Sequence, residues 1–141
     1  MKAPDNLEII RRGYEAINAG DLEAAFAYFD PEAEIRSGVD VPNLDFEDVY
    51  YGPEGFVQFH AKMSEAWEEP RWEPEEYISA GDNIVVFIRF SGIGKSSGLP
   101  VEQPIGHVCS MRDGKLVKHV TYWDRNLALR AAGLPDEEPD E

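Results

Sequence analysis

The apolar pattern of this chain changes near Pro70, and the change limits the folds that the chain can adopt. Before Pro70 the apolar residues recur mainly at helical spacing, and after it they alternate as in β-strands. The predicted order is helix (5–20), helix (21–30), strand (33–37), a loop (38–52) with a short strand near Val49-Tyr50, helix (53–69), strands (72–79, 84–91, 101–112 and 115–124) and a short helix (125–132). This order predicts an α+β fold in which the helices close one face of a curved, cone-shaped sheet and leave a pocket.

Turn residues mark the ends of these elements. In Asn18-Ala19-Gly20-Asp21-Leu22, Gly20 suits the end of the first helix and Asp21 can cap the second. Pro31 is expected to end the second helix, and Pro53 suits the first turn of the third. Asp113-Gly114 predicts a hairpin between the last two strands.

Composition restricts the class of protein. The length of 141 residues suits one domain, predicted over 1–134, with a disordered acidic tail over 135–141. Lys and Arg total 13 against 28 Asp and Glu, and the net charge of −15 argues against binding nucleic acid or anionic membranes. No apolar run approaches the roughly 20 residues that span a bilayer. The single cysteine, Cys109, excludes an internal disulfide and favours a cytoplasmic location.

A two-residue turn at Asp113-Gly114 predicts which side chains share a face of the sheet. It pairs Arg112 with Lys115 and sets His107 opposite Val120. One face then carries Gly106, Val108, Ser110, Val117, His119, Thr121 and Trp123, and the other carries His107, Cys109, Met111, Leu116, Lys118, Val120 and Tyr122.

Both predicted faces are apolar, so both need cover. Helices can cover one face, and a second copy of the chain is the simplest cover for the outer one, which predicts a homodimer. The same register directs His107 and His119 to opposite faces, while His60 lies on the third helix. No metal site is therefore expected.

Three motifs, in this order and spacing, resemble the SnoaL-like, ketosteroid-isomerase-like branch of the nuclear-transport-factor-two-like superfamily. They are Asn18-Ala19-Gly20-Asp21-Leu22, Tyr51-Gly52-Pro53-Glu54-Gly55-Phe56, and the segment from Asp113-Gly114-Lys115-Leu116-Val117 to Tyr122-Trp123-Asp124. The resemblance implies a cystatin-like conical α+β barrel, usually dimeric, with a pocket between sheet and helices and no cofactor. The group includes ketosteroid isomerases, polyketide cyclases and limonene epoxide hydrolases.

The acids of the ketosteroid isomerases are missing from the matching positions. Gly13 stands at the position of the helix tyrosine, with Tyr14 one residue away. Ser37 replaces the first aspartate and Gly106 the late one. Without a carboxylate base or acidic donors, that isomerase mechanism is not expected.

The epoxide hydrolase acids are missing too. In Arg89-Phe90-Ser91 the arginine remains and the acid is lost, and Thr121 replaces the aspartate three residues before Asp124. Because Gly106 and Thr121 fall on one predicted face, that face is expected to be the pocket wall.

His119 on this wall is the expected catalytic base, and Arg89 the expected binder of an oxyanion or carboxylate. The alternative for Arg89 is an ion pair with Glu76 or Asp124, and Asp124 itself suits a helix N-cap. The residues expected to bind ligand are Tyr14, Ser37, Trp67, Val85, Phe87, Gly106, Val108, Thr121 and Trp123.

Three function classes stay open at this point. The missing acids favour a module that binds a small apolar or aromatic molecule without chemistry. The retained His119 and Arg89 allow a cofactor-independent isomerase, cyclase or hydrolase. A core filled by its own side chains would instead indicate an interaction protein.

Overall fold

Six strands form one curved mixed sheet in the order β2-β1-β6-β5-β4-β3. The computed structural model describes residues 6–25, 27–37 and 49–137. The elements are α1 (Asn6–Asn18), α2 (Leu22–Ala25), β1 (Phe29–Ser37), β2 (Val49–Tyr51), α3 (Gly52–Ala66), β3 (Trp67–Ala80), β4 (Asn83–Gly94), β5 (Pro100–Arg112), β6 (Lys115–Tyr122) and α4 (Arg125–Ala131). Strands β1 and β6 pair in parallel, and the other neighbours pair antiparallel. The predicted α+β cone is confirmed.

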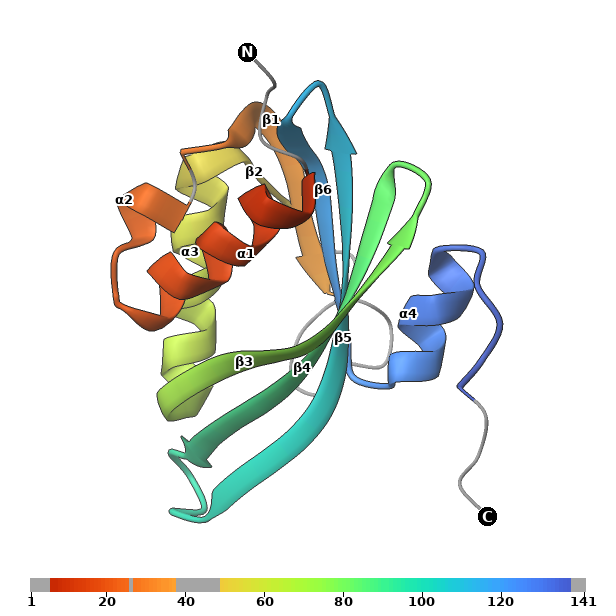
Figure 1. Ribbon diagram of the computed structural model, residues 1–141. Coiled ribbons are helices and arrows are strands. Elements are labelled where there is room, and N and C mark those ends of the chain that lie inside the picture. The colour runs from red at the N-terminus through yellow and green to blue at the C-terminus, as the bar shows by residue number, and fades with distance from the viewer. Residues whose placement is uncertain (1–5, 26, 38–48, 138–141) are drawn as a thin grey trace.

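Helices α1, α2 and α3 lie on one face of the sheet, and α4 lies on the other (Figure 1). The inner face buries Ile35, Ile88, Phe90 and Ile105 against Ile10 and other apolar residues of α1 and α3. On the outer face, Val85, Phe87 and Val108 pack with Ala128 and Leu129 of α4. Because α4 of the same chain covers these residues, they need no second copy as cover, and the homodimer stays a prediction.

The turn between α1 and α2 follows the sequence prediction. Gly20 has a φ of +80°, and its N–H and that of Asp21 bond to carbonyls of the last turn of α1. The Asp21 carboxylate accepts a hydrogen bond from the Ala24 N–H at 3.1 Å, as an N-cap does. Asn18 then ties α1 to the edge strand β3, because its amide bonds both the carbonyl (2.8 Å) and the N–H (3.4 Å) of Trp72.

Pro31 and Pro70, which were predicted to follow the ends of helices, both lie inside strands. Helix α2 ends at Ala25, and Pro31 lies inside β1, where the pairing with β6 shifts register between Phe29 and Glu34. Pro70 lies inside β3, which is an edge strand and also shifts register beside it. A proline without an N–H is tolerated at bulges and edges, where the ladder lacks a bond in any case. Residue 5, where the first helix was predicted to begin, and most of the predicted loop over 38–52 lie outside the described residues.

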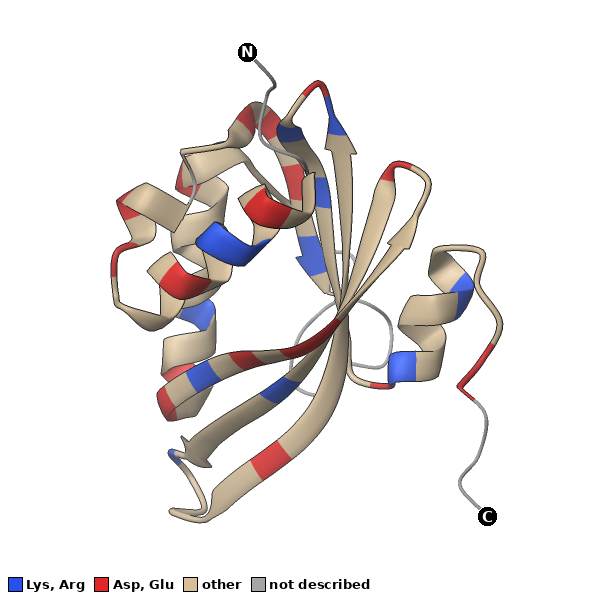
Figure 2. Ribbon diagram, viewed as in Figure 1, with Lys and Arg blue, Asp and Glu red and all other residues tan. Residues whose placement is uncertain are grey.

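Among the described residues, acidic and basic side chains do not form one large patch of a single charge in this view (Figure 2). Asp and Glu are spread over the helical layer and β3, with Lys and Arg interspersed (Figure 2). Within the described residues, no helix is both long enough and apolar enough to cross a membrane. Near the C-terminus, Asp136 forms an ion pair with Arg130 at 2.6 Å.

Gly106 should tolerate no side chain, because α4 packs directly on it. A Cβ at Gly106 would lie 2.6 Å from the Ala128 Cβ, closer than real Cβ atoms approach. We expect Gly106→Ala to lower the free energy of unfolding by about 1–3 kcal/mol through overpacking. Urea unfolding of Gly106→Ala, Ala128→Gly and the double variant measures this. The double variant should lose less than the sum of the single variants, and additive losses would contradict the contact.

Candidate functional site

A small cavity of about 30 Å³ lies between the inner face of the sheet and helices α1 and α3. A second cavity of about 10 Å³ adjoins it and shares Tyr14, Ile17, Phe56 and His119 with it. Together they have room for a few water molecules. The larger cavity is lined by Tyr14, Ile17, Ile35, Phe56, Phe59, His60, Trp72, His107, His119 and Thr121.

A bulge in the β5–β6 hairpin brings His107 and His119 to the same side. Arg112 pairs with Lys115 as predicted, but Ser110 pairs with Lys118 and His107 with Thr121. One extra residue in β6 between Leu116 and Lys118 shifts every later pair. The predicted face assignment is therefore wrong, and the rings of His107 and His119 meet edge to face with centroids 4.5 Å apart.

Tyr14 fixes the proton position on His107. Its hydroxyl lies 2.5 Å from His107 Nδ1, and both side chains are buried. Burial raises the pKa of Tyr14 well above its ordinary value of 10, so the phenol keeps its proton. We assign the hydroxyl as the donor, which leaves the His107 proton on Nε2.

Two histidine nitrogens at the cavity lack a hydrogen-bond partner among the described residues. They are His107 Nε2 and His119 Nδ1, and both are buried. Burial, together with the neighbouring histidines, lowers the pKa of His107 well below 6.5. Burial likewise lowers the pKa of His119 to about 4. Both rings are therefore neutral near pH 7, and each exposes one unsatisfied nitrogen, which is unusual for buried polar groups.

His60 and Trp72 complete the aromatic part of the wall. The His60 ring lies 4.4 Å from the Phe56 ring and 5.0 Å from the Trp72 ring, measured between centroids. Burial lowers the pKa of His60 to about 4, so this ring is neutral near pH 7 as well. His60 comes from α3 and Trp72 from the edge strand β3, where Asn18 holds the Trp72 backbone.

Four residues expected in the pocket lie on the opposite side of the sheet. Val85, Phe87 and Val108 belong to the apolar cluster under α4, and Gly106 faces Ala128. The bulge explains the error for the β5 residues, since a one-residue slip exchanges the two faces of a strand. The cavity-facing residue of β5 is His107, which the predicted register had assigned to the outer face.

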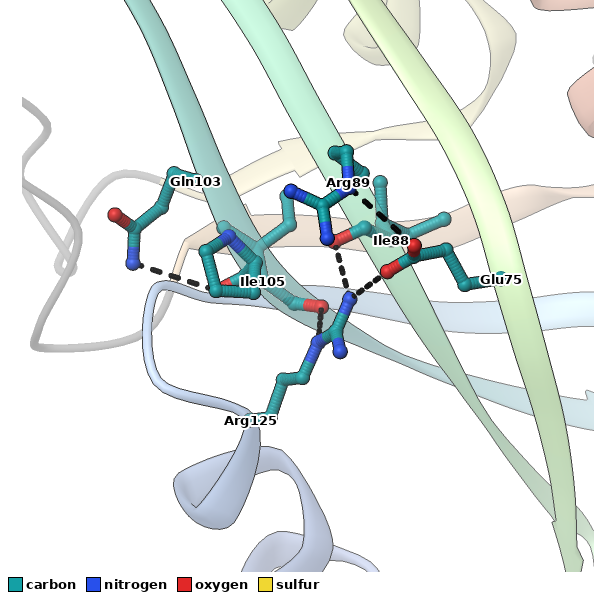
Figure 3. Close-up of polar contacts among 7 residues, drawn as sticks. Glu75, Ile88, Arg89, Gln103, Ile105 and Arg125 are labelled. Carbon is teal, nitrogen blue, oxygen red and sulfur yellow. Dashed lines mark hydrogen bonds and ion pairs between the residues drawn. The ribbon is translucent and has the colours of Figure 1, made fainter. Parts of the chain in front are cut away.

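Arg89 also lies on the outer face and is not brought near His119. Its side chain is 42% exposed and pairs with Glu75 at 3.3 Å, where sequence reasoning had named Glu76 or Asp124. Arg125 of α4 bonds the same carboxylate and donates to the carbonyls of Ile88 and Ile105 at 3.0 and 3.2 Å (Figure 3). The hydrogen bonds that the Glu75 carboxylate accepts from Arg125 and Arg89 lower its pKa. The group thus attaches α4 to the sheet.

The remaining predicted residues lie on the inner side, at different depths. Thr121 lines the larger cavity, and Ser37 is buried beside it as its pairing partner on β1. Trp67 and Trp123 pack on Phe90, with ring centroids 5.3 and 6.2 Å away. Asp124 caps α4 by accepting from the Asn126 N–H at 2.8 Å, which confirms the N-cap interpretation.

The sequence prediction missed seven of the ten residues that line the larger cavity, among them His60, Trp72 and His107. His60 lies one residue after Phe59 of the apolar stripe of α3, and that helical position was the available signal. No pattern in the sequence marks the bulge that turns His107 inward. No group of three or more His, Cys, Asp or Glu side chains in the described segments has a geometry that could hold a metal ion.

This arrangement of a curved six-stranded sheet closed by N-terminal helices is the cone fold of nuclear-transport-factor-two-like proteins. The SnoaL-like domain family matches residues 10–119, which is most of the chain. The chain therefore belongs to the SnoaL-like family, as the motifs indicated.

Solved structures of similar fold span nearly the whole chain. An NTF2-like protein from Burkholderia thailandensis is 22% identical, with 94% of this chain and 100% of that chain covered and a TM-score of 0.77. TerC, co-crystallised with polyporic acid, is 24% identical, with 90% and 96% covered and a TM-score of 0.74. A candidate SnoaL-like polyketide cyclase from a Jannaschia species is 20% identical, with 94% and 96% covered and a TM-score of 0.70. At these identities the likeness establishes the fold. No curated protein matches the sequence.

Proposed function

We propose that this protein binds a small aromatic or otherwise apolar molecule in the cavity between the sheet and helices α1 and α3. The observation that carries the proposal is the pair of unsatisfied nitrogens, His107 Nε2 and His119 Nδ1, in an otherwise aromatic and aliphatic wall. Ligand sites of this kind combine apolar walls with a few convergent polar groups. TerC, a protein of the same fold, was co-crystallised with polyporic acid, which is consistent with a small organic ligand.

Binding requires the cavity to open. A volume of about 30 Å³ admits water but not an aromatic ring, so lining side chains must move. Ile17, His60 and His119 are the lining residues that remain half-buried, and the others are buried. We therefore expect Ile17 at the end of α1 and His60 on α3 to move outward on binding.

Phenol and toluene provide a matched test, because they differ by the group that meets His107. Phenol should bind more tightly than toluene, since its oxygen can accept a hydrogen bond from the His107 Nε2–H. Such a bond contributes about 1 kcal/mol, or roughly a fivefold difference in affinity. Titration calorimetry measures both constants.

Two variants locate the binding site. His107→Phe should remove the preference for phenol, whereas Arg89→Ala, on the outer face, should leave it unchanged. Near-ultraviolet circular dichroism checks that each variant is folded. Loss of binding in Arg89→Ala with unchanged binding in His107→Phe would move the site to the other side of the sheet. Failure of both probes to bind would favour the filled-core interaction protein.

A catalytic function is the second candidate, favoured by the adjacency of His107 and His119. Neutral His119 would remove a proton, and the His107 Nε2–H would donate to the developing oxyanion. Arg89 has no part in this version, since its side chain pairs with Glu75. Exchange of the methyl protons of acetophenone in D₂O, followed by NMR, tests it. The exchange should be lost in His119→Gln, and its absence from the unaltered protein argues against catalysis.

The homodimer remains a proposal with a narrower basis. The apolar residues under α4 need no second copy as cover, because α4 already covers them. The part of the outer face beyond α4, and the exposed side chains of Tyr51 and Leu99, could still contact a second copy of the chain. A cytoplasmic location likewise remains a proposal, based on the single buried cysteine, Cys109. Native mass spectrometry of the full chain tests the dimer.

A further inference from the structure

The two histidines at the cavity form a site that one added proton would complete. In the neutral state, His107 presents the Nε2–H as a donor, and Nδ1 of the neighbouring His119 ring is unsatisfied. The rings are in edge-to-face contact, with centroids 4.5 Å apart. One further proton would give a cationic pair in which both unsatisfied nitrogens are donors. Two donors on adjacent rings match the two oxygens of a carboxylate.

No other charged group on the described lining competes with this pair. The linings of both cavities contain no Asp, Glu, Lys or Arg among the described residues. Tyr14 of α1, Tyr28 and Cys109 of β5 face the pair, and burial raises the pKa of each, so all three stay protonated and neutral. His60 of α3 is the one further base on the described lining, and it is neutral near pH 7.

We propose that the ligand is a small organic oxygen acid, such as an aromatic carboxylate, and that His107 and His119 take up one proton when its anion enters. This inference rests on the proposed function, because it names the chemical class of molecule that the same cavity binds. It also gives the unsatisfied nitrogens a role that a purely apolar ligand would leave unfilled.

The proton on the histidine pair is needed to offset the free-energy cost of burying the ligand carboxylate. An isolated carboxylate in a low-dielectric cavity loses its hydration, which strongly disfavours entry of the anion alone. An adjacent imidazolium offsets much of this loss through Coulomb attraction and two charge-assisted hydrogen bonds. Entry of the anion therefore raises the proton affinity of the pair, and the two events are linked. The net charge of −15 opposes approach of an anion, so added salt should strengthen binding.

Benzoate and benzamide test the inference, because they have nearly the same shape and differ in charge. Titration calorimetry at about pH 7, in two buffers with different ionisation enthalpies, gives the protons taken up per ligand bound. We expect about one proton for benzoate and none for benzamide. Binding of benzoate without proton uptake would overturn the inference.

Variants of the histidines identify the group that holds the proton. His119→Gln should lower benzoate affinity about tenfold or more and bring proton uptake close to zero. In His60→Gln the readout is the proton stoichiometry, which should stay near one. If uptake is lost in His60→Gln and kept in His119→Gln, His60 holds the proton and the assignment to the pair is wrong. The ¹⁵N chemical shifts of the imidazoles distinguish protonated from neutral rings in the unaltered protein. This measurement does not depend on whether a variant folds correctly.

The outcome separates this inference from the proposed function. Binding of phenol or benzamide, with exclusion of benzoate, would overturn the acid ligand and leave the cavity as a binding site. Absence of binding for all three probes would overturn the proposed function itself.

Discussion

At about pH 4.5 the protein should be on the order of 5 kcal/mol less stable than at pH 7, a large part of the 5–15 kcal/mol of a typical domain. The loss comes from the buried histidines at the cavity. The pKa of His60 and that of His119 are each lowered from 6.5 to about 4 in the folded state, with burial as the main cause.

The sign follows from the protons bound in each state. The unfolded chain protonates these histidines as the pH falls through 6.5, while the folded chain resists until about pH 4. Stability is therefore full above pH 6.5 and is lost as the pH falls toward 4, by about 2 kcal/mol for each ring at pH 4.5. His107, whose pKa is lowered further, adds to the loss. Protonation of surface carboxylates reduces the net charge of −15 and acts in the opposite direction, but weakly.

Urea unfolding monitored between about pH 4.5 and pH 7.5 measures the effect. His60→Gln should flatten the pH dependence by about 2 kcal/mol over this range, because one titrating group is removed. A matched change at an exposed, non-titrating position far from the cavity, such as Leu99→Ala, should leave the slope unchanged. A protein equally stable at both pH values would contradict the burial of the three rings.

Phe90→Ala should lower the free energy of unfolding by about 3–5 kcal/mol. Phe90 is 1% exposed and lies at the centre of an aromatic group. Its ring centroid is 5.3 Å from that of Trp67, 5.6 Å from Trp72 and 6.2 Å from Trp123. Truncation removes the ring and leaves a space that these large neighbours can fill only in part.

Thermal and urea unfolding of Phe90→Ala, with Val57→Ala as the control, measure this loss. Val57 lies on α3 with 42% of its surface exposed, so its truncation should cost less than about 0.5 kcal/mol. The tryptophan fluorescence of Phe90→Ala should change as well, because Phe90 contacts all three tryptophans. A loss below about 1 kcal/mol would indicate that the cluster is not packed as described.

The elements and their order could be read from local patterns. The stripe of α3, the alternation of β4 and the turn at Asp113-Gly114 identify their elements through residues close in sequence. The same holds for Gly20 and Asp124, whose cap geometry needs neighbours within a few residues. These patterns, with the order of the elements, were enough to predict the α+β cone and the family.

The faces of the last hairpin could not be read in this way. Thr121 and His119 were expected on the pocket wall and do line the cavity, but His107 was expected on the other side. The turn fixes the first pair, Arg112 with Lys115, and the bulge after Leu116 changes the register from there on. A bulge is stabilised by packing across the sheet, which involves residues far apart in sequence.

The sequence by itself determined the type and order of the elements, because helical and strand periodicities depend on side chains a few positions apart. The tertiary structure alone decided which residues meet. It set Tyr14 against His107 across 93 positions, turned Arg89 away from His119, and placed α4 over the outer face. The physical reason is that side chains alternate between the two faces of a strand, so one inserted residue exchanges inside and outside for all the residues beyond it.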